Sequence, residues 1–169
     1  FIGTGRKWKT PGATGFGMAY AHASGYKKLP GIGLAACADV VREVAEEFAR
    51  ETGTKTVYTD YRKMLKAEGL DMVSICTWPH LHARMVVDCC RAGVKAIHCE
   101  KPMATTWGDS LKMAKVAKDS GVKLTFNHQR RFGEAYIKAR EIVRSGRIGE
   151  LRRMEAFCGD LYDWGTHWL

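Results

Sequence analysis

The sequence predicts an α/β fold with a doubly wound parallel sheet, because short apolar, strand-like segments alternate with helical patterns. Each pair of strand-like segments is separated by a few helical turns, as a right-handed crossover between parallel strands requires. Two further observations support this fold. The first strand-like segment runs into a glycine-rich loop, and the second ends in a carboxylate. Open sheets of this kind bind ligands at the carboxyl ends of their strands.

The expected strands lie near residues 1–3, 33–38, 56–58, 71–76, 95–99 and 122–126. The expected helices lie near residues 17–27, 41–52, 60–68, 80–92, 107–120 and 133–145. In the second helix, Val44, Ala45 and Phe48 recur at helical spacing and Gly53 follows the last turn. After these elements the segment "ELRRMEAFCGDLY" alternates, which predicts a strand that opens a second, sheet-based domain.

Composition indicates a soluble globular protein, with 46% hydrophobic and 27% charged residues among 169. The sequence holds no apolar run near the ~20 residues of a membrane span, so we expect no membrane partner. Its six cysteines include no C-x-x-C pair and sit inside apolar patterns. We therefore expect reduced core thiols, a cytoplasmic location and no metal site.

The formal net charge of +9 raises nucleic acid as a partner. However, lysine and arginine are spread along the chain, with no basic run of five or more residues. An anionic cofactor and solvated helix faces explain the charge more simply, and we expect no nucleic-acid partner.

The glycine-rich loop starts with Gly3 and Gly5 at the end of the first strand. Glycines at this place let the backbone turn tightly and approach a pyrophosphate at a helix N-terminus. The simple G-x-G-x-x-G spacing fails because residue 8 is Trp. The sequence instead predicts a loop lengthened by "RKWKTPGATG", followed by a helix that starts near Gly17. These three glycines are the expected pyrophosphate contacts.

Asp39 ends the second strand, 22 positions after Gly17. A carboxylate ~20 residues beyond the last glycine typically accepts hydrogen bonds from the adenosine ribose. It also repels a 2′-phosphate, so we expect NAD rather than NADP, although Arg42 weakens this preference. The alternative is that Asp39 caps the following helix.

Several motifs then occur in order along nearly the whole chain: "GTG", "ACAD", "SICTWPHLH", "HCEKPMA", "FNHQRRF" and "DWGTH". In this succession the chain resembles the Gfo/Idh/MocA oxidoreductases. The resemblance implies an NAD(P)-binding Rossmann domain over residues 1–127. Over residues 128–169 it implies a connecting helix and the beginning of an α+β substrate domain, inside which we expect the chain to end.

The resemblance also implies further cofactor contacts beyond the glycines and Asp39. Thr77 and His80 are expected to line the nicotinamide side of the cleft, where this chain has T-W-P-H-L-H and the family usually T-P-N-x-x-H. Glu100 and Lys101 are expected at the carboxyl end of the fifth strand, where Pro102 fixes the backbone, a cis bond being one way to do so. The remaining expected contacts, near the nicotinamide and the substrate, are Asn127 and Gln129.

The expected catalytic residues are Lys101, Asp163 and His167. The lysine charge is useful against a developing alkoxide in a dry cleft. The alternative is that Lys101 forms an ordinary surface ion pair with Glu100. Asp163 and His167 are four apart and share a face if helical, and histidine suits general acid or base chemistry. Their alternative roles are a helix N-cap and a buried core histidine.

The resemblance therefore predicts an NAD(P)-dependent dehydrogenase that moves a hydride between nicotinamide and a hydroxyl of a sugar, cyclitol or related polyol. An NAD-dependent glycosidase on the same scaffold and a non-catalytic NAD-binding regulatory protein remain alternatives. When full length, the protein is expected to be a homo-oligomer.

Overall fold

The computed structural model describes residues 1–7, 10–11 and 17–157. The chain divides into two compact units, Phe1–Asn127 and His128–Leu169. The expectation that the second unit opens a substrate domain stays a prediction.

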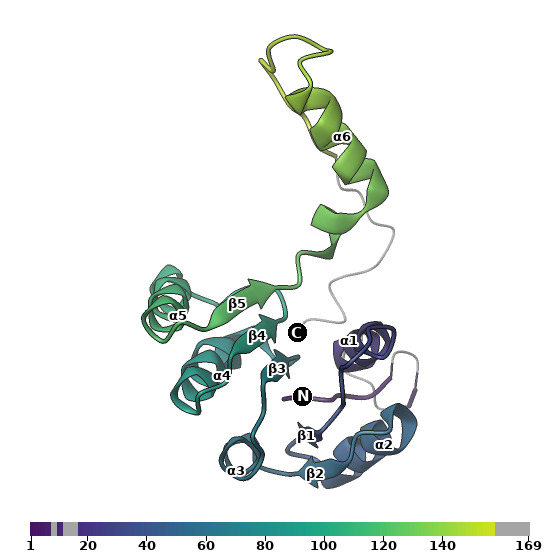
Figure 1. Ribbon diagram of the computed structural model, residues 1–169, viewed down its shortest axis with the longest axis vertical. Coiled ribbons are helices and arrows are strands. Elements are labelled where there is room, and N and C mark those ends of the chain that lie inside the picture. The colour runs from purple at the N-terminus through teal and green to yellow at the C-terminus, as the bar shows by residue number, and fades with distance from the viewer. Residues whose placement is uncertain (8–9, 12–16, 158–169) are drawn as a thin grey trace. The chain divides into compact units, whose positions relative to one another are not determined.

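The first unit alternates strands and helices in the order expected from the sequence (Figure 1). Its strands are β1 (Ala36–Ala38), β2 (Thr56–Tyr58), β3 (Met72–Ile75), β4 (Ala96–Cys99) and β5 (Lys123–Phe126). Its helices are α1 (Met18–Tyr26), α2 (Arg42–Thr52), α3 (Tyr61–Ala67), α4 (Pro79–Arg91) and α5 (Trp107–Asp119).

All the strand pairs are parallel, with β1 beside β2 and with β4 between β3 and β5. Ile2 joins the two groups, because it forms parallel bridges with both Ala38 and Ile75. The expected first strand at residues 1–3 is thus reduced to a bridge at Ile2. Counting Ile2 as a strand, the order is β2, β1, Ile2, β3, β4, β5. This order confirms the predicted doubly wound sheet of a Rossmann fold, and its direction of winding reverses at Ile2.

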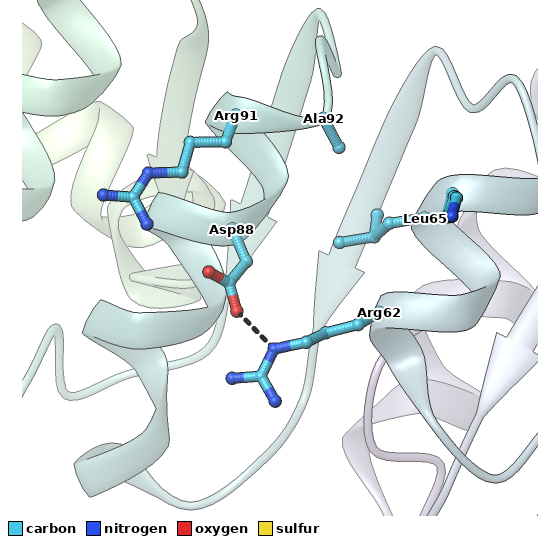
Figure 2. Close-up of a pocket in the computed structure, with 6 residues that line it drawn as sticks. Arg62, Leu65, Asp88, Arg91 and Ala92 are labelled. Carbon is cyan, nitrogen blue, oxygen red and sulfur yellow. Dashed lines mark hydrogen bonds and ion pairs between the residues drawn. The ribbon is translucent and has the colours of Figure 1, made fainter.

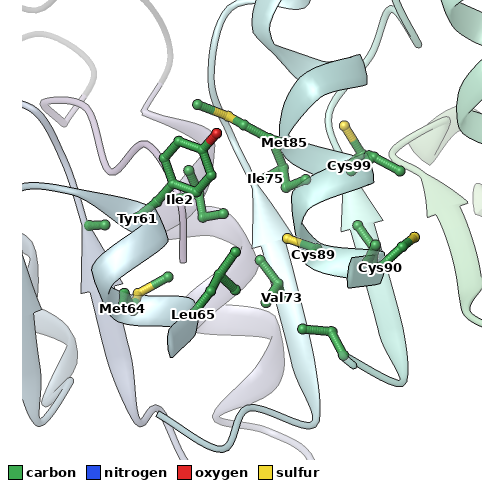
Figure 3. Packing of buried hydrophobic residues seen from close by; sticks show 14 of the residues in the cluster. Ile2, Tyr61, Met64, Leu65, Val73, Ile75, Met85, Cys89, Cys90 and Cys99 are labelled. Atoms are coloured by element: carbon green, nitrogen blue, oxygen red, sulfur yellow. The ribbon is translucent and has the colours of Figure 1, made fainter. Parts of the chain in front are cut away.

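Helices cover both faces of the sheet. The side chains of consecutive strand residues point to opposite faces, so neighbouring residues pack against different helices. Phe1 packs with α1 and α2, whereas Ile2 packs with α3, α4 and α5. Figure 3 shows the cluster around Ile2, in which Met64 from α3 and Cys89 from α4 meet Val73 and Ile75 of β3. In α2 the buried residues include Val44, Ala45 and Phe48, the positions that the apolar spacing predicts.

The second unit contains a short 3-10 helix, η1 (Gln129–Phe132), and α6 (Glu134–Arg144). The strand expected over "ELRRMEAFCGDLY" does not form in its described part, residues 151–157. The physical reason is that a strand needs a neighbouring backbone to pair with, and none of the described residues pairs with this segment. The rest of the segment lies outside the described residues.

The five cysteines in the described part of the chain are free thiols: Cys37, Cys76, Cys89, Cys90 and Cys99. Four of them are buried and Cys76 is half-buried, as expected for core thiols. Across residues 1–7, 10–11 and 17–157, no helix is both long and apolar enough to cross a membrane.

We predict that Phe48→Ala destabilises the first unit by about 3–5 kcal/mol, the usual cost of a phenylalanine-sized cavity. Phe48 is fully buried, and its ring makes edge-on contacts of 5.0 Å between centroids with both Phe1 and Tyr20. Urea denaturation measures the change. Val40→Ala is the control, since Val40 is 88% exposed and should shift stability by less than about 0.5 kcal/mol. Equal urea midpoints for Phe48→Ala and Val40→Ala would contradict the assignment of Phe48 to the core.

Candidate active site

The candidate site lies at the carboxyl edge of the sheet, around the point where the direction of winding reverses. The parallel hydrogen-bond ladder continues past the strands into the residues of this edge. The amide of Gly3 donates to the Ala38 carbonyl at 2.9 Å, and the amide of Glu100 donates to the Ile75 carbonyl at 2.8 Å. The amide of Asn127 likewise donates to Cys99 at 2.9 Å. Gly3, Glu100 and Asn127 therefore share one rigid edge, where open α/β sheets bind ligands.

The glycine loop has the backbone geometry that the sequence predicts. Gly3, Gly5 and Gly17 have φ angles of 77°, 59° and 56°. Residues other than glycine rarely adopt backbone angles in this region. A Cβ on Gly3 would lie 2.5 Å from Cγ2 of Thr77, and one on Gly17 would collide with the Arg6 carbonyl. Gly3 and Gly17 therefore need glycine both for backbone conformation and for close approach, whereas Gly5 needs it for conformation alone.

Helix α1 starts directly after this loop with Gly17 as its N-cap. Among the described residues no side chain bonds to its first amides, and its first turn carries no acidic residue. Unpaired amides at a helix N-terminus favour an anion, and the glycines leave space for it to approach. The residues present fit a dinucleotide pyrophosphate.

Asp39 holds the glycine loop in place. Its Oδ2 accepts from the backbone amide of Thr4 at 2.8 Å, from the Thr4 hydroxyl at 3.1 Å and from the Gly5 amide at 3.1 Å. Its Oδ1 accepts from the Val41 amide at 3.1 Å. That last bond closes a turn just before α2. Asp39 therefore lies close to the place where a residue that caps this helix would be, which was the alternative role for it. Contact with the ribose stays a prediction, for which Oδ1 retains acceptor capacity.

The described part of the lengthened loop lies against α2. Arg6 is 3.8 Å from Glu47, and Lys7 forms an ion pair with Glu51. The Lys7 ammonium also lies 5.6 Å from the centre of the Tyr20 ring. Because these pairs are exposed, they orient the start of the loop rather than stabilise the fold strongly. Residues 8–9 and 12–16 lie outside the described residues.

The loop after β3 and the start of α4 carry two expected cofactor contacts and one residue that the sequence analysis missed. Thr77 is half-buried and His80 is exposed at the edge. His82 is fully buried, with Nε2 3.0 Å from the Thr77 carbonyl and Nδ1 2.9 Å from the Pro102 carbonyl. Its imidazole links the loop after β3 to the loop after β4. The sequence gave no sign of these partners.

Glu100 is the buried centre of the site, only 5% exposed. Its Oε1 lies 2.9 Å from Nε2 of His22 and 2.6 Å from Nδ2 of Asn127, and its Oε2 accepts from the Lys101 amide at 3.1 Å. Burial by itself raises the pKa of Glu100, but the hydrogen bonds from His22 and Asn127 outweigh it. The pKa therefore lies below its ordinary value of 4.5, and the carboxylate is ionised at neutral pH.

Lys101 is exposed at the lip of this edge, and its peptide bond to Pro102 is cis. Glu100 contacts the amide of Lys101 and keeps its carboxylate inside the protein, where His22 and Asn127 bind it. Glu100 thus acts within the protein, and its direct contact with a cofactor stays a prediction.

His22 is a second residue that the sequence analysis did not identify. It is 8% exposed and lies among polar groups, with Nδ1 3.0 Å from the Ser74 hydroxyl and 3.4 Å from the sulfur of Cys76. The ring of His98 lies 4.8 Å away, centre to centre. Burial, reinforced by the neighbouring His22, lowers the pKa of His98.

Three expected site residues lie outside the first unit or outside the described residues. Gln129 is exposed in η1 and belongs to the second unit. Asp163 and His167 lie outside the described residues. Their roles stay predictions. In the described part of the chain, no three His, Cys, Asp or Glu side chains gather into a group that could hold a metal ion.

A shallow depression of about 420 Å³ lies elsewhere, between α3 and α4 (Figure 2). An ion pair of 3.1 Å between Arg62 and Asp88 crosses it, and Leu65 and Ala92 form its apolar part. None of the residues expected at the cofactor edge lines it, so it is a separate surface feature.

Comparison with known proteins identifies similar sequences and folds. The model of the oxidoreductase family with an NAD-binding Rossmann fold, GFO_IDH_MocA, matches residues 11–128. Levoglucosan dehydrogenase of Pseudarthrobacter phenanthrenivorans is 33% identical over 160 residues, covering 88% of this chain and 40% of the relative. The scyllo-inositol 2-dehydrogenase (NAD(+)) of Bacillus subtilis is 30% identical, covering 85% and 42%.

Solved structures agree with these matches. An NAD binding oxidoreductase from Klebsiella pneumoniae has a TM-score of 0.75 at 30% identity, covering 88% of this chain and 38% of that one. The myo-inositol 2-dehydrogenase of Lactobacillus plantarum has a TM-score of 0.75 at 28% identity, covering 88% and 41%. The chain thus spans about two fifths of the length of the relatives it matches.

We predict that Asp39→Asn shifts cofactor preference toward NADP. The amide oxygen can still accept from the Thr4 and Gly5 amides, while the negative charge that repels a 2′-phosphate is removed. Titrating NAD and NADP separately by calorimetry measures the ratio of their affinities. Asp39→Ala should weaken NAD more than NADP, and an unchanged ratio in both variants would refute the ribose assignment.

We also predict that Glu100 contributes stability that depends on pH. Because its folded-state pKa is depressed, this stability is fully present above the ordinary pKa of 4.5 that the unfolded chain retains, and is lost as pH falls through the folded-state pKa. The difference in melting temperature between the wild type and Glu100→Gln should therefore narrow as pH falls below about 4. A constant difference from neutral to acid pH would contradict the lowered pKa.

Proposed function

Because the chain belongs to the Gfo/Idh/MocA oxidoreductase family, with an NAD-binding Rossmann fold, we propose that the protein is an NAD-dependent dehydrogenase acting on a hydroxyl group. The family's description names NAD binding, in agreement with the cofactor expected from the sequence. The substrate class that we propose is a sugar, a cyclitol or a related polyol.

One observation carries the proposal: the glycine cradle and Lys101 lie at the same edge of one parallel sheet. The glycines at positive φ leave room for the pyrophosphate beside the N-terminus of α1. The amide of Lys101 is held by Glu100, whose own amide extends the ladder of β4 and β3. A dinucleotide that binds across this edge, with its pyrophosphate at the glycines, has its nicotinamide ring on the side of β3, β4 and β5.

In the proposed chemistry, Lys101 stabilises negative charge on the substrate oxygen. When bound, NAD supplies a hydride acceptor at its nicotinamide ring. As the substrate C–H bond breaks, its hydroxyl loses a proton and develops alkoxide character, which a nearby ammonium stabilises more in the transition state than in the ground state. We assign proton removal to His167 and its orientation to Asp163.

The substrate class is supported by the relatives. Two of them are named for the oxidation of levoglucosan and of scyllo-inositol, which are compact molecules with several hydroxyl groups. The residues that distinguish such substrates belong, by this proposal, to the domain that the second unit begins. The expected homo-oligomeric state, the absence of a nucleic-acid partner and the cytoplasmic location stay predictions.

Turnover by the full-length protein tests the proposal. It should be incubated with NAD or NADP and with myo-inositol, scyllo-inositol or levoglucosan, while NADH absorbance is followed. Net NADH formation with at least one polyol is expected. Release of free sugar from a glycoside without net NADH would instead indicate a glycosidase, and NAD binding without any turnover would indicate a regulatory protein.

We predict that Lys101→Met lowers kcat/KM by about 10²-fold or more, the usual effect of losing one oxyanion donor. NAD affinity and melting temperature should change little, because methionine retains most of the apolar stem. Steady-state kinetics, calorimetry and thermal unfolding measure the three quantities.

Lys95→Met is the matched control. Lys95 precedes β4, at the opposite end of the same strand, and is paired on the surface with Asp71 at 2.7 Å. It should retain full activity. If Lys101→Met unfolds or loses NAD binding, while the turnover per bound cofactor stays normal, Lys101 is a structural residue and the catalytic assignment is wrong.

A further inference from the structure

We infer that His22 is a positioning residue of the candidate active site, which acts on Lys101 and Asn127 through the buried carboxylate of Glu100. The inference rests on the proposed function, because it concerns the placement of the residues that carry it.

The carboxylate of Glu100 joins three elements of the first unit. Nε2 of His22, from α1, lies 2.9 Å from Oε1, and Nδ2 of Asn127, at the end of β5, lies 2.6 Å from the same oxygen. The amide of Lys101 donates to Oε2 at 3.1 Å. One ionised group therefore fixes both the Lys101 backbone and the Asn127 side chain.

The direction of each hydrogen bond follows from the charge of Glu100. An ionised carboxylate only accepts hydrogen bonds, so Nε2 of His22 donates to it. Nδ1 is then left to accept from the Ser74 hydroxyl at 3.0 Å. The Ser74 oxygen in turn accepts from the hydroxyl of Tyr26 at 2.9 Å. In a neutral imidazole, the carboxylate of Glu100 thus selects the tautomer of His22, and the Ser74 hydroxyl pairs with the ring nitrogen that is left.

The order carboxylate, imidazole and hydroxyl also occurs in hydrolases with a serine nucleophile, but the burial of Ser74 excludes that use here. Ser74 lies inside β3 and is 3% exposed, and its hydroxyl faces His22 and Tyr26. A nucleophile must reach its substrate. The same groups placed beneath the edge of the sheet instead hold Glu100 in position.

Loss of the His22 donor has a specific consequence for the site. Glu100 would keep only two of its three donors while remaining almost fully buried, and a buried carboxylate is costly when it is not satisfied. It would rotate or become protonated, and either change releases the Lys101 amide or the Asn127 side chain. Because a misplacement of about 1 Å in an active site costs up to ~10²-fold in rate, we expect kcat to fall by about 10- to 100-fold.

Two variants of His22 in the full-length protein test this. In His22→Gln the side-chain amide reaches the position of Nε2 and can still donate to Glu100, whereas His22→Leu fills the space without a donor. With the polyol that the wild type oxidises, His22→Leu should lose about 10- to 100-fold in kcat, with substrate KM and NAD affinity within about threefold of the wild type. His22→Gln should recover most of the loss.

Phe48→Leu controls for lost stability, since it weakens the core that α1 and α2 share and leaves the Glu100 contacts in place. It should lower the melting temperature without lowering kcat. If His22→Leu likewise keeps its kcat at temperatures where it is folded, or if His22→Gln is as inactive as His22→Leu, the positioning role is refuted.

A measurement without cofactor or substrate keeps the inference separate from the proposed function. The melting temperatures of His22→Leu, Glu100→Gln and the double variant should be non-additive, because both single changes break the same contact. Additive losses would overturn the inference whatever the activity. A wild type that oxidises no polyol would overturn the proposed function and the catalytic part of this inference, while non-additivity would still support His22 as the residue that holds Glu100.

Discussion

The first unit depends on the backbone of Ile2, which pairs with strands on both sides. Its amide donates to the Ser74 carbonyl at 2.8 Å, and its carbonyl accepts from the Cys76 amide at 2.8 Å. Through its bridge to Ala38 it also joins the β1 side of the sheet. The side chain is 2% exposed, so burial and pairing fix the same residue. The reversal of winding, and with it the ligand edge, lies where this short segment turns into the glycine loop.

The first unit also buries an ionised group, the carboxylate of Glu100. A buried ionised group is tolerated only when its lone pairs are satisfied, and here the donors come from α1, from the end of β5 and from the backbone after β4. Because these donors belong to different elements, the carboxylate also specifies how those elements meet. A methionine or leucine at this place would fill the space but would take from Nδ2 of Asn127 and Nε2 of His22 the acceptor that they bind here.

Local patterns were sufficient to predict the helices and the strands β1 to β5 of the first unit, whereas the strand expected at residues 1–3 is only a bridge at Ile2. A helix is defined by neighbours a few residues away. The end of α2 illustrates this: Gly53 has φ 75° and closes the helix predicted to stop there. The strand predicted after α6 was wrong over residues 151–157, because a strand also needs a partner backbone, which can lie far away in sequence. An alternating pattern predicts a strand only where such a partner is present.

The site was only partly predictable for the same physical reason. Gly3 could be placed from its position after the first strand, and the resemblance placed Thr77, Glu100 and Asn127 near the ends of later strands. His22 and His82 could not, because their partners are distant in sequence: Glu100 is 78 positions from His22, and Pro102 is 20 from His82. Asp39 was expected to face the ribose, and its bonds to Thr4 and Gly5 went unforeseen, since the loop conformation that creates them depends on positive φ angles.

These long-range contacts fix the backbone around Lys101, an exposed residue whose side chain has to be positioned for the proposed chemistry. A lysine side chain has a flexible stem, and fixing it costs conformational entropy. Here the amide of Lys101 is held by Glu100, and the carbonyl of the next residue lies 2.9 Å from Nδ1 of His82. The backbone is thus fixed on both sides of Lys101 by buried side chains of α1 and α4, acting directly or through Glu100. The folded backbone thus sets the point from which the Lys101 side chain extends before substrate binds, and this lowers the entropic cost of positioning its ammonium.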